Sequence, residues 1–187
     1  MSKPEPIKTF THNECKVEIY IDPDPMSPAE WDGLGTIVHW HRRDHLFGQA
    51  GDRDHVLPAD IVVKLPIWIY QHGGISVWAG GSAPADPWDS GQVGWIYMTR
   101  EQVSENWPDW KLITPKRKKL IEKVLEARVK SWDDYYLGRV YGYEVTAPDG
   151  SQDSCWGFYG DDGYVEQAAR DAAAHLNPQL PLPGVLA

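Results

Sequence analysis

The sequence predicts an α+β fold, a single domain in which a long amphipathic helix and a C-terminal helix pack on one face of a mainly antiparallel sheet. Three observations support this. Many segments alternate apolar and polar residues with the period of a half-buried strand. One later segment carries apolar residues at spacings of three and four, and an alanine-rich segment, 164–176, follows it. At 187 residues the chain can bury a core without disulfides.

Proline and glycine set the expected boundaries. Residues 1–15 contain prolines and no apolar periodicity, so we expect a flexible lead before a domain over 16–177, and a flexible tail over 178–187. Pro28 follows Ser27, which is expected to cap a short helical turn. The chain over 42–59 is polar and charged, as expected of a surface loop. The expected strands are 16–22, 36–41, 61–70, 75–78, 92–97, 140–146 and 153–160.

Two helix starts are expected from local capping chemistry. Thr99 and Gln102 have the spacing of a capping box. Thr114 followed by Pro115 is a favoured start for the long helix, and Gly138 is well placed to end it. The apolar stripe of that helix is Ile121, Leu125, Val129, Trp132 and Tyr136.

Two motifs combine tryptophan with glycine, WDSGQVGWIY over 88–97 and DSCWGFYG over 153–160. A glycine inside a strand usually marks a bulge or a close approach of another backbone. Val93, Trp95 and Tyr97 should share one face of the first strand. We expect both motifs in one sheet, with a buried tryptophan beside each glycine: Trp95 with Gly94, and Trp156 with Gly157.

Composition restricts the partners. The net charge of −9 argues against direct nucleic-acid binding, because neutralising phosphates requires a basic face. An acidic surface can serve solubility or can mimic nucleic acid toward a basic partner. The sequence has no apolar run near the length of a membrane span and no signal-like N-terminal stretch, so we expect no membrane partner. With only two cysteines, Cys15 and Cys155, a cytoplasmic location is expected.

A histidine-rich segment is the main candidate for metal chemistry. Its possible ligands are His39, His41, Asp44 and His45, since residues at i and i+2 of a strand share a face. The segment resembles the His-x-His-x-Asp-His motif of metallo-β-lactamase-type hydrolases, but has one additional residue before the aspartate. The other interpretation is a strand end with structural histidines.

No residue pattern indicates catalysis, and no cofactor is expected. Cys155 lies in an aromatic strand and is expected to be a small buried residue and not a nucleophile. The only basic run, 116–119, lies in the first turn of the long helix, where positive charge opposes the helix dipole. It is either a solvated face or a docking site for a phosphate or an acidic partner.

The chain also resembles a family of small uncharacterised proteins encoded by bacteriophages and other mobile elements. The resemblance spans about 16–162 and implies a phage source, but no catalytic residue. The residues that carry it are Asp22-Pro23-Asp24-Pro25, Gly35-Thr36, His41-Arg42-Arg43, 88–94 and 153–160.

We therefore expect a phage-encoded accessory protein that binds a host or phage macromolecule, with a protein as the expected partner. One form of this expectation is an inhibitor of host defence of the anti-CRISPR or anti-restriction type. Tryptophan is a favoured anchor at interfaces, and ten are present. The alternative is a small metal-dependent hydrolase that uses the histidine segment. The candidate binding residues are Trp88, Asp89, Gln92 and Asp153.

Overall fold

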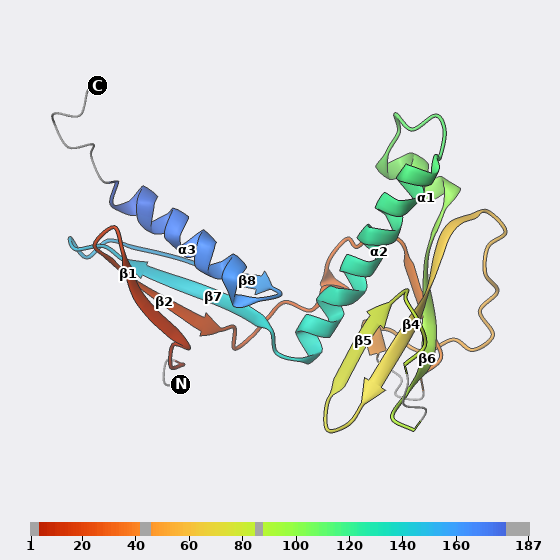
Figure 1. Ribbon diagram of the computed structural model, residues 1–187, viewed down its shortest axis with the longest axis horizontal. Helices are drawn as coiled ribbons and strands as arrows, with labels where there is room; N and C mark the ends of the chain where they lie inside the picture. The colour runs from red at the N-terminus through yellow and green to blue at the C-terminus, as the bar shows by residue number, and fades with distance from the viewer. Residues whose placement is uncertain (1–3, 42–45, 85–87, 179–187) are drawn as a thin grey trace. The chain divides into compact units, whose positions relative to one another are not determined.

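The computed structural model describes residues 4–41, 46–84 and 88–178. It confirms the α+β class, with antiparallel strands and helices packed on them. The expectation of one sheet is wrong, because the strands form two separate four-stranded sheets (Figure 1). They belong to two compact units: the second unit is Ser27–Leu137, and the first unit is formed by the chain before and after it. One domain over 16–177 stays a prediction.

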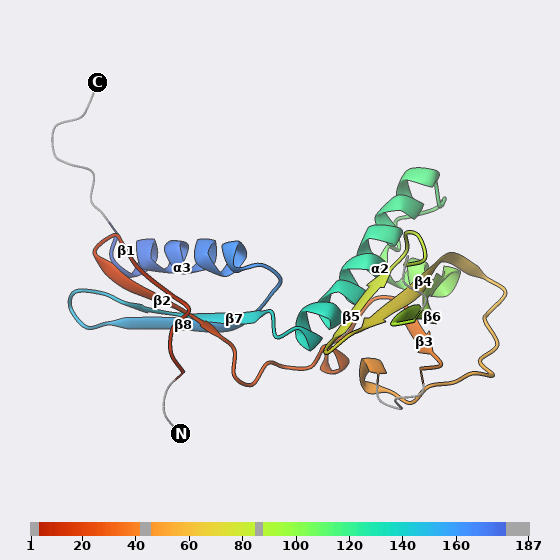
Figure 2. The same cartoon turned by 60° about the horizontal axis from the view of Figure 1, so that its bottom comes forward.

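The first unit is a four-stranded sheet with one helix on it. Its strand order is β1-β2-β7-β8, and all pairs are antiparallel. The helix covers one face of the sheet (Figure 2), where its alanines pack against apolar residues of β2 and β7. The elements are β1 Lys8–His12, β2 Cys15–Ile21, β7 Val140–Thr146, β8 Gln152–Tyr159 and α3 Asp162–Leu176.

Strand β1 corrects the expectation of a flexible lead over 1–15. It pairs with β2 from Lys8 opposite Ile19 to His12 opposite Cys15. The strand is an edge strand with mostly exposed or half-buried side chains, so its sequence lacks the apolar alternation that marks the inner strands. Strand formation here depends on the neighbouring strand and not on local pattern.

The second unit has the strand order β3-β6-β4-β5, again antiparallel throughout. Helix α2 lies along one face of this sheet, as both ribbon views show (Figures 1 and 2). The elements are η1 Pro28–Glu30, β3 Thr36–His39, η2 Leu46–Gly48, β4 Ile61–Gln71, β5 Ile75–Ala79, β6 Ser90–Thr99, α1 Arg100–Asn106 and α2 Pro115–Tyr136.

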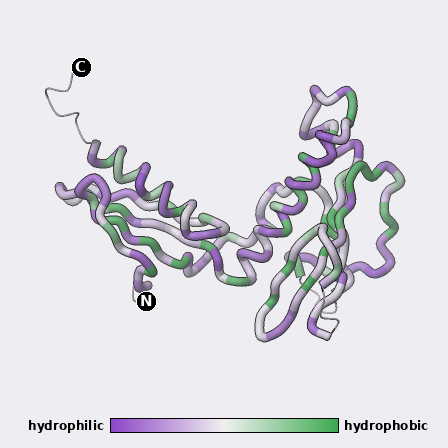
Figure 3. The backbone as a smooth tube through the Cα atoms, in the orientation of Figure 1, coloured by the Kyte–Doolittle hydropathy of each residue, from purple (hydrophilic) through white to green (hydrophobic). Residues whose placement is uncertain are grey.

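The helix caps are confirmed. The Thr99 side chain accepts from the Gln102 backbone N–H, and the Gln102 side chain accepts from the Thr99 backbone, so the capping box is complete. The Thr114 side chain caps α2 by accepting from the Arg117 backbone N–H, and Gly138 follows the helix with φ +66°. Hydrophobic and hydrophilic residues alternate along α2 (Figure 3), and four residues of the expected stripe are buried: Ile121, Leu125, Val129 and Trp132.

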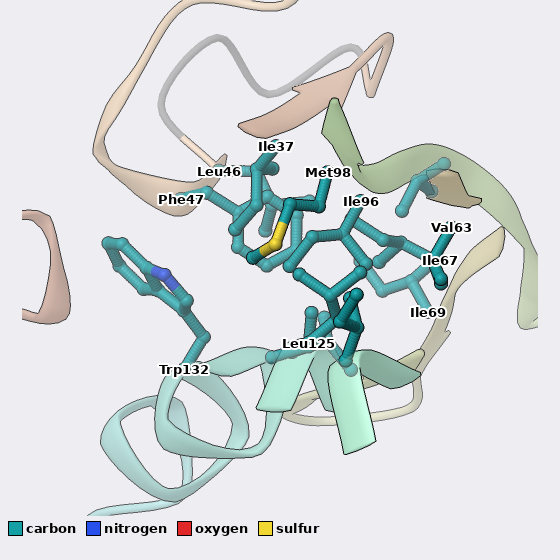
Figure 4. Packing of buried hydrophobic residues seen from close by; sticks show 14 of the residues in the cluster. Ile37, Leu46, Phe47, Val63, Ile67, Ile69, Ile96, Met98, Leu125 and Trp132 are labelled. Carbon is teal, nitrogen blue, oxygen red and sulfur yellow. The ribbon is translucent and has the colours of Figure 1, made fainter. Parts of the chain in front are cut away.

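The predicted surface loop over 42–59 instead contributes to the core. Leu46 and Phe47 are buried in the cluster between α2 and the sheet (Figure 4). Phe47 adopts φ +59°, and its N–H donates to the Tyr136 hydroxyl at 2.8 Å. Burial raises the pKa of Tyr136 to about 12. In the sequence this segment is mostly polar and charged, so the roles of Leu46 and Phe47, which anchor it in the core, were not apparent.

Strand β6 contains a β-bulge at Val93. Its neighbours Gln92 and Gly94 lie opposite consecutive residues of β4, so Val93 is the extra residue. The bulge reverses the alternation: Val93 packs in the core, whereas Trp95 points to the other face of the sheet. The expectation that Val93, Trp95 and Tyr97 share a face is therefore wrong.

The second tryptophan–glycine motif also contains a bulge. Gly157 is its extra residue, with φ +84°, and the Gly157 N–H donates to Asp22 Oδ2 at 3.1 Å. The Trp156 ring lies over Gly142, where an added Cβ would be 2.2 Å from the ring, and is 5.8 Å from the ring of Tyr20. Both motif glycines thus mark irregular backbone, as expected.

The expected burial and shared sheet of the two motifs are wrong. Trp156 is 39% exposed and Trp95 is half-buried. Gly94 is in the second unit's sheet and Gly157 is in the first unit's. Cys155, expected to be buried, is exposed because β8 is an edge strand.

Candidate functional site

Aromatic side chains gather on the face of the second unit's sheet that is opposite α2. Ile67 and Ile69 of β4 point into the core beneath α2, so the alternating residues Trp68 and Tyr70 point to the other face. Trp78 of β5 lies directly across from Trp68 and therefore shares that face. We call the group Trp68, Tyr70, Trp78 and Trp95 the outer aromatic face.

The rings of the outer aromatic face are held in place and remain partly exposed among the described residues. Trp68, Trp78 and Trp95 are half-buried, and Tyr70 is 38% exposed. The Trp68 indole N–H donates to the Gly80 carbonyl oxygen at 3.0 Å. The Lys64 ammonium lies 4.2 Å from the ring centre of Trp95. Large rings held in this way lose little conformational entropy when a partner covers them.

The loop that contains Trp88 borders the outer aromatic face. Trp88 is 92% exposed. The next residue, Asp89, is held through its backbone and its side chain. Its backbone carbonyl oxygen accepts from the Gln71 N–H at 2.7 Å, and its carboxylate lies 2.8 Å from His72 Nδ1. His72 in turn stacks with Tyr70 at a ring distance of 6.3 Å. The backbone beside Trp88 is thus tied to the β4–β5 hairpin.

The opposite end of the same sheet face is covered. Tyr97 is buried, and its hydroxyl lies 3.2 Å from His55 Nε2 in the chain between η2 and β4. That segment runs along the side of the sheet away from α2 (Figure 1). Among the described residues, the more exposed part of the face is therefore the part nearest the β4–β5 hairpin and Trp88.

Three of the four predicted binding residues lie in this region. Trp88 and Asp89 border it, and Gln92 is paired with Trp68, so it shares the outer face. The Gln92 side chain donates to the Gly94 carbonyl oxygen at 3.1 Å. Asp153 is exposed on β8 in the first unit and belongs to a different surface.

Sequence reasoning missed Trp68 and Trp78. Both strands are apolar on their two faces, so the core-facing residues hide the outward tryptophans. The sequence did contain a signal: Trp68 and Trp78 each follow a β-branched residue, Ile67 and Val77, that faces the core. A strand with large apolar residues on both faces is typical of a sheet that is covered on both sides.

The histidine segment is only partly described. His39 is buried at the end of β3, and its Nε2 lies 2.9 Å from the Gln49 carbonyl oxygen. Because a carbonyl only accepts, Nε2 carries the proton and holds the loop after η2. His41 lies just past the strand, and Asp44 and His45 lie outside the described residues. Within the described ranges, no three His, Cys, Asp or Glu side chains are grouped as a metal site.

The surroundings of His39 lead to a prediction for metal content. We expect protein purified without chelator to contain well below stoichiometric transition metal, because no two further His, Cys, Asp or Glu side chains of the described residues are grouped with His39 to complete a site. Elemental analysis of the wild type and of a His39→Ala/His41→Ala variant measures this. Stoichiometric metal that the variant loses would favour the hydrolase alternative.

None of the helices in the described part of the chain is both long and apolar enough to cross a membrane. Protein-family models, curated proteins and solved structures contain no match to this chain. The resemblance to phage and mobile-element proteins therefore stays a prediction.

Proposed function

We propose that the protein is a phage-encoded accessory protein that binds a host or phage protein through the outer aromatic face and Trp88. The observation that carries the proposal is the partly exposed group of tryptophan and tyrosine rings on one sheet face, next to the loop of a tryptophan that is 92% exposed. Tryptophan and tyrosine are the residues most enriched among those that dominate binding energy.

Keeping large aromatic surface in water lowers the stability of an isolated protein, and a contiguous exposed patch usually marks an interaction site. Polar groups surround these rings, namely Gln92, Asp89 and His72, and they supply the polar rim of a protein interface. Inhibition of a host defence protein is the role we propose for this binding, since the net charge of −9 suits a basic partner.

The test uses a double variant and a matched control. Tagged wild type, Trp88→Ala/Tyr70→Ala and Tyr164→Ala are expressed in bacteria, and the bound proteins are identified by mass spectrometry. Tyr164 is 65% exposed in the first unit, so its removal deletes a similar ring from another surface. We expect one partner bound by the wild type and the control, and at least about tenfold weaker binding by the double variant.

Two results would overturn the proposal. One is a partner that the double variant retains and Tyr164→Ala loses, which would move the interface to the first unit. The other is the absence of any enriched protein together with unchanged phage plating on strains that carry defence systems.

A further inference from the structure

The N-terminal half of α2 carries a concentrated group of positive charges in a protein of net charge −9. Several of these side chains surround a depression of about 560 Å³ that also has an apolar floor. The residues that line it, which we call the basic α2 surface, are Trp110, Thr114, Lys116, Arg117, Lys119, Leu120 and Lys123.

The lysines of this surface are not neutralised. In the part of the chain that the structure describes, Lys116, Lys119 and Lys123 have no carboxylate within ion-pair distance. Some other lysines of the described residues are paired: Lys8 pairs with Glu166, and Lys130 lies 2.6 Å from Asp134. Positive charge in the first turn of a helix also opposes the helix dipole, so Lys116 lowers the stability of α2. These costs are recovered if an anionic partner binds.

The surface also has a hydrophobic element. Leu120 is 45% exposed and lies between Lys116 and Lys123 on one side of the helix, at spacings of four and three residues. An apolar side chain of a partner can pack on Leu120 while acidic groups beside it contact the lysines. A free small anion would leave Leu120 in water.

The aromatic side chain of the depression distinguishes two kinds of acidic partner. Trp107 stacks on Trp110 with ring centres 4.7 Å apart and planes 12° apart, and Arg117 lies over the Trp110 ring at 4.8 Å. Binding of single-stranded nucleic acid depends on aromatic faces that are free for base stacking. The faces of Trp110 already have these two neighbours, so a base would have to displace one of them.

We propose that the basic α2 surface is a second binding site, for an acidic protein segment with an apolar residue that packs on Leu120. Carboxylates of the segment accept hydrogen bonds from the ammonium groups of Lys116, Lys119 and Lys123. The site shares no residue with the outer aromatic face. Exposed ion pairs contribute little each and are screened by salt, so binding is weak and salt-dependent.

Calorimetry with synthetic probes tests the ligand class. The probes are a glutamate-rich peptide with leucines, the same peptide with each leucine replaced by serine, and a single-stranded oligonucleotide of equal charge. We expect the leucine peptide to bind at least about tenfold more tightly than the other two at low salt. Equal binding of the serine peptide would overturn the role of Leu120, and tighter binding of the oligonucleotide would overturn the assignment to a protein segment.

Charge reversal at a second pair of lysines provides the control. Lys119→Glu/Lys123→Glu changes the depression, whereas Lys111→Glu/Lys118→Glu makes the same change of net charge at exposed lysines that do not line it. We expect at least about tenfold loss of peptide binding in the first variant and less than about threefold in the second. Equal losses would show a nonspecific charge effect and overturn the site. Circular dichroism confirms that both variants fold.

Discussion

Replacing Gly94 by valine is expected to lower the free energy of unfolding of the second unit by about 3 kcal/mol or more. An added Cβ at Gly94 would lie 2.2 Å from the Val38 carbonyl oxygen and 3.0 Å from the Cα of His39. Both obstacles are backbone atoms of β3, so no side-chain rotation relieves the clash. Strand β3 would have to separate from β6, with loss of their hydrogen bonds.

Gly91 in the same strand is the matched control. Nothing lies within 4 Å of an added Cβ there, so Gly91→Val should change the unfolding free energy by less than about 0.5 kcal/mol. Urea denaturation followed by tryptophan fluorescence measures both. Similar midpoints for Gly94→Val and wild type would show that β3 and β6 do not approach as closely as the structure indicates.

Trp132→Ala is the second substitution with a large expected effect, a loss of about 3–5 kcal/mol. Trp132 is buried between α2 and the loop after β3, with ring distances of 5.6 Å to both Phe47 and Tyr136. Removing the indole leaves a cavity next to the Phe47–Tyr136 hydrogen bond and releases the loop that this bond holds. A domain of ordinary stability, about 5–15 kcal/mol, would be strongly destabilised.

Thermal denaturation of Trp132→Ala and Trp88→Ala compares a buried with an exposed tryptophan in the same unit. We expect Trp88→Ala to melt within about 2 °C of the wild type, since exposed substitutions change stability little. If Trp88→Ala proved as destabilising as Trp132→Ala, Trp88 would contribute to the stability of the fold and would not be an exposed binding anchor.

The helices could be predicted because their signals are local. Thr99, Thr114 and Gly138 each act on backbone groups within a few residues, so short sequence windows contain the necessary information. The stripe of α2 is similarly visible in one stretch.

The arrangement of the strands could not be predicted in the same way. Some partners in these sheets are distant in sequence: β2 pairs with β7, and β3 pairs with β6. No nearby residue in the sequence shows that Val93 is the additional residue of a bulge. Assigning the residues of β6 to the two sheet faces by simple alternation therefore fails beyond Val93.

For the candidate site, the sequence identified Trp88, Asp89 and Gln92 but not the tryptophans they accompany. Trp68 and Trp78 become neighbours through the register of β4 and β5, which turn residues alone do not determine. The basic run 116–119 was apparent in the sequence. The packing of Trp107 and Arg117 on the Trp110 ring depends on tertiary structure and was not.

The chain order of the two units has a consequence for biosynthesis. The Asp22 N–H donates to the Val140 carbonyl oxygen at 2.8 Å, so the first unit's sheet closes where the contiguous segment Ser27–Leu137 leaves and returns. During translation, β1 and β2 emerge first but have no inner partner until the whole inserted segment has been synthesised. Such non-local closure carries a high contact order and is slow. The inserted unit can therefore fold while its host is still incomplete, and β2 leaves the ribosome as an unpaired edge that is open to aggregation.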